Sequence, residues 1–175
     1  QNTQWGYICP SETPEGHSIG VVKNFSVTCE ITKDIDIDPI LYYMNDYIIE
    51  INKIDIFKNN KNNFIKLFIN GDIIGYIKQP DLFVKDFKKH RTNKCIHYHS
   101  SIHWDIKYNT IYIFTDKGRC IRPLISNINN NIPDIKEFLK LSWNEIINLN
   151  IIEYIDIHET DNTLIGISFD KKDKN

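Results

Sequence analysis

The sequence predicts an α+β fold, in which short helices accompany antiparallel sheet built from hairpins. Short runs of β-branched residues end at turn dipeptides such as Asn70-Gly71, and Pro-Asp or Asp-Pro pairs stand where helices would begin. No strand–helix repeat of the kind that builds a parallel doubly wound sheet is present. With 175 residues, 41% of them hydrophobic, the chain can bury the core of one domain or two small ones.

The first half of the chain contains strands, a helix and a hairpin in that order. Residues 20–31 are rich in β-branched residues with partial alternation, which predicts one or two short strands. Asp38 as a cap and Pro39 in the first turn begin a helix that runs to about residue 48. The run KNNKNN at 58–63 predicts a solvated loop, and the segments on either side of Asn70-Gly71 predict a hairpin.

A second helix begins at Pro80 and Asp81, with one apolar face and a basic remainder. Its basic stretch is either a solvated helix face or a local nucleic-acid patch. It consists of Lys85, Lys88, Lys89, His90 and Arg91.

The last third predicts a hairpin, a helix and two strands. Residues 111–114 and 120–121 flank TDKGR, which indicates a second hairpin with its turn at Gly118. A capping-box pattern, Ser142 with Glu145, begins a helix that ends near residue 149. Strands at 151–157 and 164–169 follow, and the chain ends in a frayed segment, 170–175.

Charge and composition exclude several classes of protein. The formal net charge of -2, from 21 basic and 23 acidic residues, offers no general attraction to a polyanion, so any nucleic-acid contact must be local. The chain has neither a membrane-spanning apolar run nor a signal-peptide pattern, which predicts a soluble intracellular protein. Its four cysteines lack CxxC spacing, as is typical of reduced thiols. Phosphate-binding glycine loops and nucleophile elbows are absent.

The segment CPSETPEG, residues 9–16, is the first candidate site. Pro10 and Pro14 fix φ, Gly16 is free to take unusual angles, and Glu12 and Glu15 place two carboxylates three positions apart. These residues predict a rigid loop that can hold an acidic side chain at a fixed place. From the residues alone, this is either an ordinary surface loop or a functional one.

A second candidate is a zinc site made of Cys95, His97, His99 and His103. On a strand the first three side chains would share one face, and tetrahedral zinc accepts such ligands. However, the spacing matches no standard zinc pattern, and no second ligand pair stands at a suitable separation. The alternative is a group of surface histidines.

The stretch QNTQWGYICPSETPEGHSIGVVKNFS, residues 1–26, resembles a specific segment of the second-largest subunit of multisubunit DNA-directed RNA polymerases from eukaryotes, archaea and large DNA viruses. In that family the segment reads roughly HNTHWGxxCPxETPEGxxxGLVKNLS. Three further blocks agree in order, namely FINGDIIGYIKQP, IYIFTDKGRCIRPL and the segment around EYIDIHE. The resemblance spans essentially the whole chain and implies that both ends are cut from a longer one.

The resemblance implies three parts. Residues 1–32 would be the end of the fork domain on the active-centre side, residues 33–125 an external domain, and residues 126–175 a truncated small domain. A loop of Glu12, Thr13, Pro14, Glu15, Gly16 and His17 would face the active centre, supported by Lys23 and Asn24. None of these residues is expected to be catalytic directly. Asn150 stands where the family usually has glycine, and we expect it to adopt a left-handed cap.

The resemblance also implies partners and a cofactor for the intact enzyme. Mg²⁺ would be held by an aspartate triad in the largest subunit, so this chain binds no metal and Glu15 has a positioning role. The partners would be the largest subunit, other polymerase subunits, the DNA template and nascent RNA, with no membrane. The location would be the nucleus, or a cytoplasmic viral factory or virion. The fragment alone would be inactive. The alternative is a stand-alone module that binds a regulator or nucleic acid without catalysis.

Overall fold

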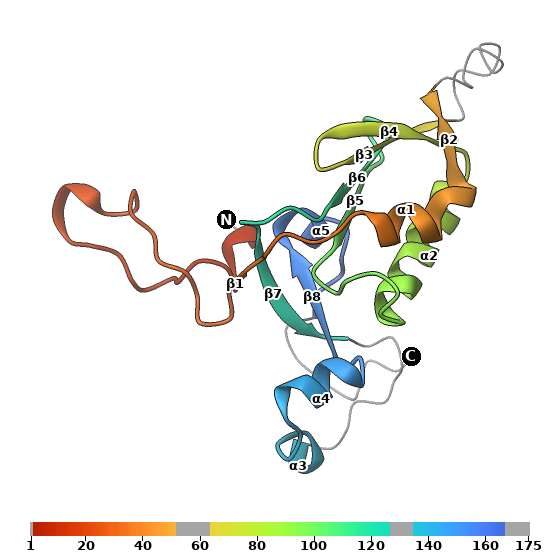
Figure 1. Ribbon diagram of the computed structural model, residues 1–175. Coiled ribbons are helices and arrows are strands. Elements are labelled where there is room, and N and C mark those ends of the chain that lie inside the picture. The colour runs from red at the N-terminus through yellow and green to blue at the C-terminus, as the bar shows by residue number, and fades with distance from the viewer. Residues whose placement is uncertain (1, 52–63, 127–134, 167–175) are drawn as a thin grey trace.

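The computed structural model describes residues 2–51, 64–126 and 135–166, which form two sheets, short flanking helices and one projecting arm (Figure 1). The larger sheet has five strands in the order β2-β4-β3-β6-β5. All neighbours are antiparallel except β3 and β6, which are parallel. Its strands are β2 (Ile48–Glu50), β3 (Ile65–Ile69), β4 (Asp72–Ile77), β5 (Ser101–Asp105) and β6 (Thr110–Phe114).

The hairpin β3–β4 confirms the prediction from the Asn-Gly pair. Asn70 has φ 50° and Gly71 has φ 94°, the left-handed angles that a two-residue turn requires. In β3 the alternate residues Ile65, Leu67 and Ile69 are buried, because side chains of a strand point to opposite faces. The sequence pattern therefore sets which face meets the core.

Helices α1 (Asp38–Met44) and α2 (Pro80–Thr92) cover that face (Figure 1). Both carry a proline at the first or second position, as expected. The cap of α1 is Ile37 and not Asp38, and α1 is shorter than predicted because the 3-10 turn Asn45–Tyr47 leads into β2. The core consists of side chains from both helices, four strands and the loop before β5: Ile40, Met44, Ile65, Leu67, Ile69, Ile77, Phe83, Phe87, Ile96, Ile102, Ile111 and Ile113.

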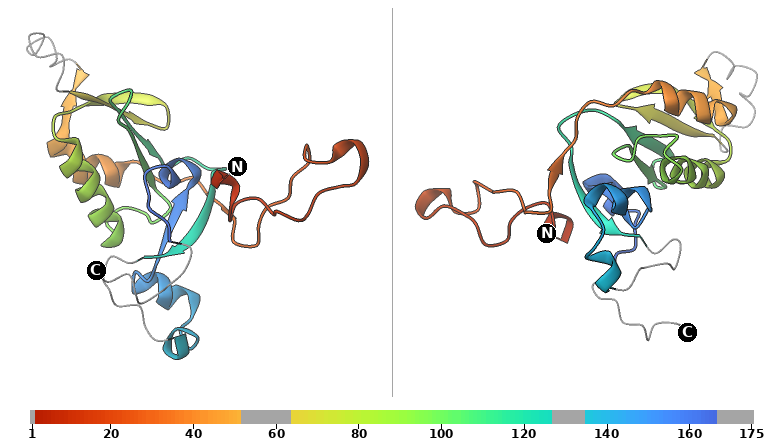
Figure 2. Two further views of the ribbon diagram at one scale, coloured as in Figure 1. Left: turned by 180° about the vertical axis from the view of Figure 1, so that it is seen from behind. Right: turned by 60° about the horizontal axis from the view of Figure 1, so that its bottom comes forward.

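The smaller sheet has three antiparallel strands in the order β1-β7-β8. These are β1 (Glu30–Ile31), β7 (Cys120–Ile125) and β8 (Ile152–Asp156). The helices α3 (Ile135–Phe138) and α4 (Trp143–Asn148) lie beyond one end of this sheet, and α5 (Ile157–Thr160) follows β8 directly (Figure 2). The predicted capping box at Ser142 and Glu145 is present, and Asn150 has φ 54° as expected.

The predicted second hairpin is wrong, because β6 and β7 belong to different sheets. Gly118 does sit in a turn, with φ 84°, but its N–H donates to the Thr32 carbonyl oxygen at 3.0 Å. The Thr32 hydroxyl accepts the Arg119 N–H at 3.0 Å and donates to the Asp116 carbonyl oxygen at 3.0 Å. The residue after β1, Thr32, thus bonds to the turn at residues 116–119, and β6 does not pair with β7.

Other strand predictions hold in part. Within 20–31 the structure has only β1 and an isolated bridge between Ile8 and Phe25, because most side chains there are exposed. Residues 164–166 are not a strand, and the rest of that predicted strand lies outside the described residues, as do 58–63 and 170–175. The mixed α+β class is confirmed, and the four cysteines are free thiols. Among the described residues, no helix combines the length and apolar composition needed to cross a membrane.

Candidate functional site: a projecting arm and its anchoring network

The CPSETPEG segment lies in an arm, residues 9–24, that extends away from both sheets (Figures 1 and 2). Pro10 and Pro14 prevent helix formation over most of it, and Gly16 with φ 82° opens the short 3-10 turn Gly16–Ser18 near its far end. Gly20 turns the chain back with φ 74°. The sequence therefore produces an extended loop rather than a helix or a sheet.

Two predicted site residues brace the loop from within. The Thr13 hydroxyl accepts the Gly20 N–H at 3.1 Å and donates to the Val22 carbonyl oxygen at 3.5 Å. The Asn24 side-chain amide donates to the Glu12 carbonyl oxygen at 3.3 Å. These bonds tie the outgoing and returning halves of the arm together and limit its shapes.

The ionisable side chains of the predicted site point to solvent. Glu12, Glu15, His17 and Lys23 are all exposed, and Pro14 is half-buried. Exposed ionisable side chains on a braced loop keep their hydration in the free protein and are accessible to another macromolecule. The structure therefore brings the predicted loop residues together in one accessible place, with Lys23 on the returning half.

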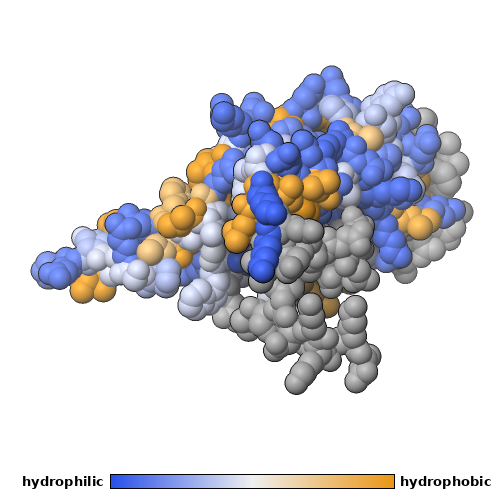
Figure 3. All heavy atoms as spheres, turned by 90° about the horizontal axis from the view of Figure 1, so that it is seen from below, coloured by the Kyte–Doolittle hydropathy of each residue, from blue (hydrophilic) through white to orange (hydrophobic). Residues whose placement is uncertain are grey.

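A row of exposed apolar side chains follows the charged loop, and sequence reasoning missed it. Val21 is 80% exposed and Val27 fully exposed, and the apolar surface along the arm is visible in Figure 3. Exposed apolar surface that is contiguous is typical of interaction sites. The row consists of Ile19, Val21, Val22, Phe25 and Val27. The β-branched run that predicted strands is the signal that could have indicated it.

The four candidate zinc ligands make other contacts, and two of them, His97 and His99, contact each other. The His97 Nδ1 accepts the His99 N–H at 3.1 Å, His103 Nδ1 lies 2.8 Å from the His158 carbonyl oxygen, and the Cys95 thiol lies 3.9 Å from the Asn93 carbonyl oxygen. His99 is buried against Tyr154. Over residues 2–51, 64–126 and 135–166, no three His, Cys, Asp or Glu side chains are placed to hold a metal ion. The described residues therefore offer no ligand set that supports the zinc hypothesis.

The other sequence blocks form a partly buried polar network in the body. Asn70 in the first turn exchanges hydrogen bonds with Thr115: its amide nitrogen donates to the Thr115 hydroxyl and its amide oxygen accepts the Thr115 N–H, both at 2.8 Å. Arg119 of the TDKGR block pairs with Asp156 of the EYIDIHE block at 3.2 Å, and Ser101 donates to the same carboxylate. These blocks therefore hold the two sheets together.

Arg91 is the second centre of this network. Its guanidinium donates to both Glu159 carboxylate oxygens at 2.8 Å, to the Ser100 carbonyl oxygen at 2.8 Å and to Glu153. Burial alone lowers the pKa of Arg91, and the charges of Glu159 and Glu153 outweigh that effect and raise it. Arg91 is buried, so it is not part of a solvated basic face or a nucleic-acid patch.

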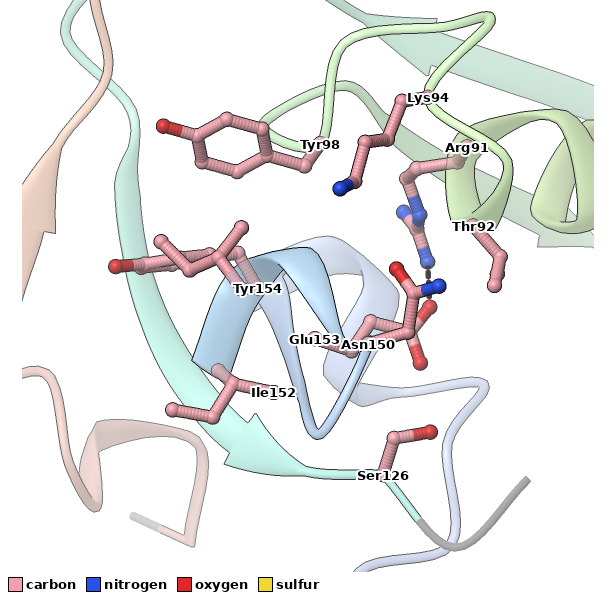
Figure 4. A pocket seen from close by; sticks show the side chains of 10 residues that line it. Arg91, Thr92, Lys94, Tyr98, Ser126, Asn150, Ile152, Glu153 and Tyr154 are labelled. Carbon is pink, nitrogen blue, oxygen red and sulfur yellow. Dashed lines mark hydrogen bonds and ion pairs between the residues drawn. The ribbon is translucent and has the colours of Figure 1, made fainter. Parts of the chain in front are cut away.

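A shallow pocket adjoins this network between the end of α2 and β8 (Figure 4). The Arg91 side chain points toward Glu153 there, and Lys94 donates to the Asn148 side chain at 2.8 Å and to its carbonyl oxygen at 3.2 Å. The positive groups of the pocket are therefore already compensated by the protein's own oxygens. The arm, and not this pocket, is the candidate site.

Comparison with known proteins finds matches to the segment that contains the arm and to part of the body. Residues 1–31 match the family model "RNA polymerase Rpb2, domain 3", and residues 67–127 match "RNA polymerase Rpb2, domain 4". DNA-directed RNA polymerase II subunit 2 of Arabidopsis thaliana is 31% identical over 95% of this chain and 15% of its own length. DNA-directed RNA polymerase III subunit RPC2 of Schizosaccharomyces pombe is 30% identical over the same shares, 95% and 15%.

This chain belongs to the family of RNA polymerase second-largest subunits. It corresponds to the part of that subunit in which domains 3 and 4 follow each other. The chain spans about 15% of the length of the curated relatives it matches. Relatives from polymerases II and III match it with similar identity.

Proposed function

We propose that the parent of this chain takes part in template-directed RNA synthesis, and that the loop at residues 12–17 forms part of the fork-side wall of its active centre. Family membership and the geometry of the arm support the proposal. The observation that carries it is a braced, charged loop extended from the body at the place where the match to domain 3 falls. Thr13 and Asn24 keep the loop's shape, which leaves the exposed Glu15 to make the outward contact.

The division of labour within the enzyme follows from the chemistry of the residues. Phosphoryl transfer needs metal ions, and we place the Mg²⁺ ligands in the largest subunit, as the resemblance implies. Over residues 2–51, 64–126 and 135–166 no three His, Cys, Asp or Glu side chains are placed to hold a metal ion, which is consistent with that assignment. Glu15 then acts by positioning neighbouring protein elements. Its charge would repel phosphates at close range.

We infer that the chain comprises parts of three domains of the subunit. Residues 1–32 form the end of the fork domain, 33–125 an external domain, and 126–175 the beginning of a further small domain. The partners are the largest subunit, other polymerase subunits, the DNA template and the nascent RNA. Because the relatives are polymerase II and III subunits of eukaryotes, we infer a nuclear enzyme.

The test is the substitution Glu15→Ala in the complete polymerase, with Asp161→Ala, an exposed acid on the body, as the matched control. The Glu15 variant should assemble normally and show an altered elongation rate or fidelity, whereas the control should match the unmodified enzyme. If only assembly suffered, the loop would be a structural element and the proposal would fail.

A further inference from the structure

The arm is fastened to the body at one place, its stalk, which comprises residues 6–9 and 24–28. The side chain of Tyr7 is 1% exposed, although most of the residues that follow it in the arm are exposed. Its hydroxyl lies 3.0 Å from the Ile155 carbonyl oxygen and 3.0 Å from the Thr160 hydroxyl. These partners belong to β8 and α5, so Tyr7 joins the start of the arm to the last part of the body.

Arg122 of β7 holds the other side of the same ring. Its guanidinium carbon lies 5.2 Å from the centroid of the Tyr7 ring, within the range of a cation–π contact. The Arg122 Nε is buried and has no hydrogen-bond partner, although an unpaired buried donor is costly. The side chain nevertheless stays against the stalk, where it packs on the Tyr7 ring and interacts with the Tyr7 hydroxyl.

Gly6 makes that packing possible. It has φ 80°, and a Cβ built there would lie 2.6 Å from the Cδ and Nη1 atoms of Arg122. Only a residue without a side chain allows the backbone and the arginine to come this close. Gly6, Tyr7 and Arg122 thus form one interlocked contact.

The returning half of the stalk is tied to the same point. The Ser26 N–H donates to the Tyr7 carbonyl oxygen at 3.0 Å, and the Thr28 hydroxyl donates to the Gly6 carbonyl oxygen at 2.8 Å. Further along, the Cys9 N–H donates to the Asn24 carbonyl oxygen at 2.9 Å. Both halves therefore leave the body from one fixed place.

We propose that Tyr7 and Arg122 are positioning residues, which fix the direction of the arm and thereby the place of the loop at residues 12–17 in the assembled polymerase. The inference rests on the proposed function. A small rotation at the stalk displaces the far end of the arm by a larger distance, and small misplacements at a reaction centre reduce rates strongly. Gly6 is required because it lets Arg122 reach the stalk.

The test uses the complete polymerase. Tyr7→Phe keeps the ring beneath the Arg122 guanidinium but removes the hydroxyl and its contacts with Ile155, Thr160 and Arg122. Gly6→Ala drives a methyl group into Arg122. We expect both variants to assemble and to lower the maximal elongation rate by roughly three- to ten-fold, with a smaller change in KM for the nucleoside triphosphate. Thr160→Ala removes one contact of the Tyr7 hydroxyl, together with the Thr160 hydrogen bond to the Asp156 carbonyl oxygen, and should reproduce the Tyr7→Phe effect in part.

Unchanged rates in assembled Tyr7→Phe and Gly6→Ala enzymes would overturn the inference. If Gly6→Ala fails to assemble, Tyr7→Phe, which removes one oxygen atom, decides alone. Glu15→Ala, measured in the same assay, separates the two proposals. A Glu15 variant with altered rate or fidelity beside normal Tyr7 and Gly6 variants contradicts only the stalk inference. Normal rates and normal fidelity in all three contradict the proposed function as well.

Discussion

Arg91 and Glu159 form a two-pronged ion pair, with both guanidinium–carboxylate distances at 2.8 Å and side chains only 3% and 1% exposed. The pair joins α2, which covers the larger sheet, to α5, which follows the last strand of the smaller sheet. A buried pair of this kind contributes little compared with an apolar contact, but losing one member leaves a buried charge without a partner. It therefore fixes how the two sheets meet.

Replacing Arg91 with methionine should destabilise the chain by about 3–5 kcal/mol, because the buried Glu159 carboxylate would lose both guanidinium bonds and retain only the partly exposed Lys88, 3.8 Å away. Urea denaturation measures the change. Lys85→Met, on the exposed face of the same helix, is the matched control and should change the free energy of unfolding by less than about 1 kcal/mol. Equal effects from the two variants would show that the pair does not join the sheets.

The amide of Asn70 bonds to Thr115 across 45 residues, and its backbone has a positive φ. Asn70→Gly keeps the backbone freedom and removes both side-chain bonds, so it should cost roughly 1–3 kcal/mol. Asn109→Gly is the control, since Asn109 also has positive φ, 51°, and is exposed in a turn. Thermal unfolding of the two variants should differ by several degrees, and identical melting temperatures would remove Asn70 from the network.

His99 should make stability depend on pH. Burial first, and then the nearby charges of His97 and Arg119, lower the pKa of His99 to about 4 from 6.5. The carboxylate of Glu30 lies 3.9 Å from the His99 Nε2 and favours the protonated form, but Glu30 is half-exposed and water screens it. Burial therefore outweighs the effect of Glu30, and the pKa of His99 is lowered.

The unfolded chain takes up a proton on this histidine below about pH 6.5, whereas the folded chain does so only near pH 4. The free energy of unfolding is therefore unaffected by protonation of His99 above about pH 6.5. It decreases as the pH falls from about 6.5 to about 4, by a total on the order of 3 kcal/mol. Urea denaturation at pH 7.0, 5.5 and 4.5 should show a smaller acid loss for His99→Gln than for the unmodified chain. His17→Gln, at an exposed histidine, should follow the unmodified chain, and parallel curves for all three proteins would refute the role of His99.

The predictable parts of the fold are those whose information lies within a few residues. The Asn70-Gly71 turn and the Ser142–Glu145 capping box are local, and both are present. The turn between β6 and β7 bonds to Thr32, which lies 87 positions before Arg119, and the two strands belong to different sheets. The local turn residues alone therefore predict a β6–β7 hairpin that does not form. The burial of Arg91 was hidden for the same reason, because Glu153 and Glu159 lie 62 and 68 positions further along.

For the candidate site, the sequence predicts the loop but not the contacts that attach the arm to the body. The prolines and glycines of residues 9–16 predict a rigid loop, and the resemblance placed it in a family. The apolar row from Ile19 to Val27 was interpreted as strand, because alternating β-branched residues look alike whether they face a core or a partner. The roles of Gly6 and Tyr7 depend on Arg122, more than a hundred positions later, and no local pattern reveals them.

The most direct test of the account is the location of the loop in an elongating polymerase. A photoreactive amino acid at position 17, beside Glu15, should crosslink to the incoming nucleotide, the 3′ end of the RNA or the protein elements that surround them. The same group at Tyr108, which is 65% exposed on the body, should not. Crosslinks from position 17 only to peripheral subunits, or none that depend on the assembled elongation complex, would contradict the assignment of this loop to the wall of the active centre.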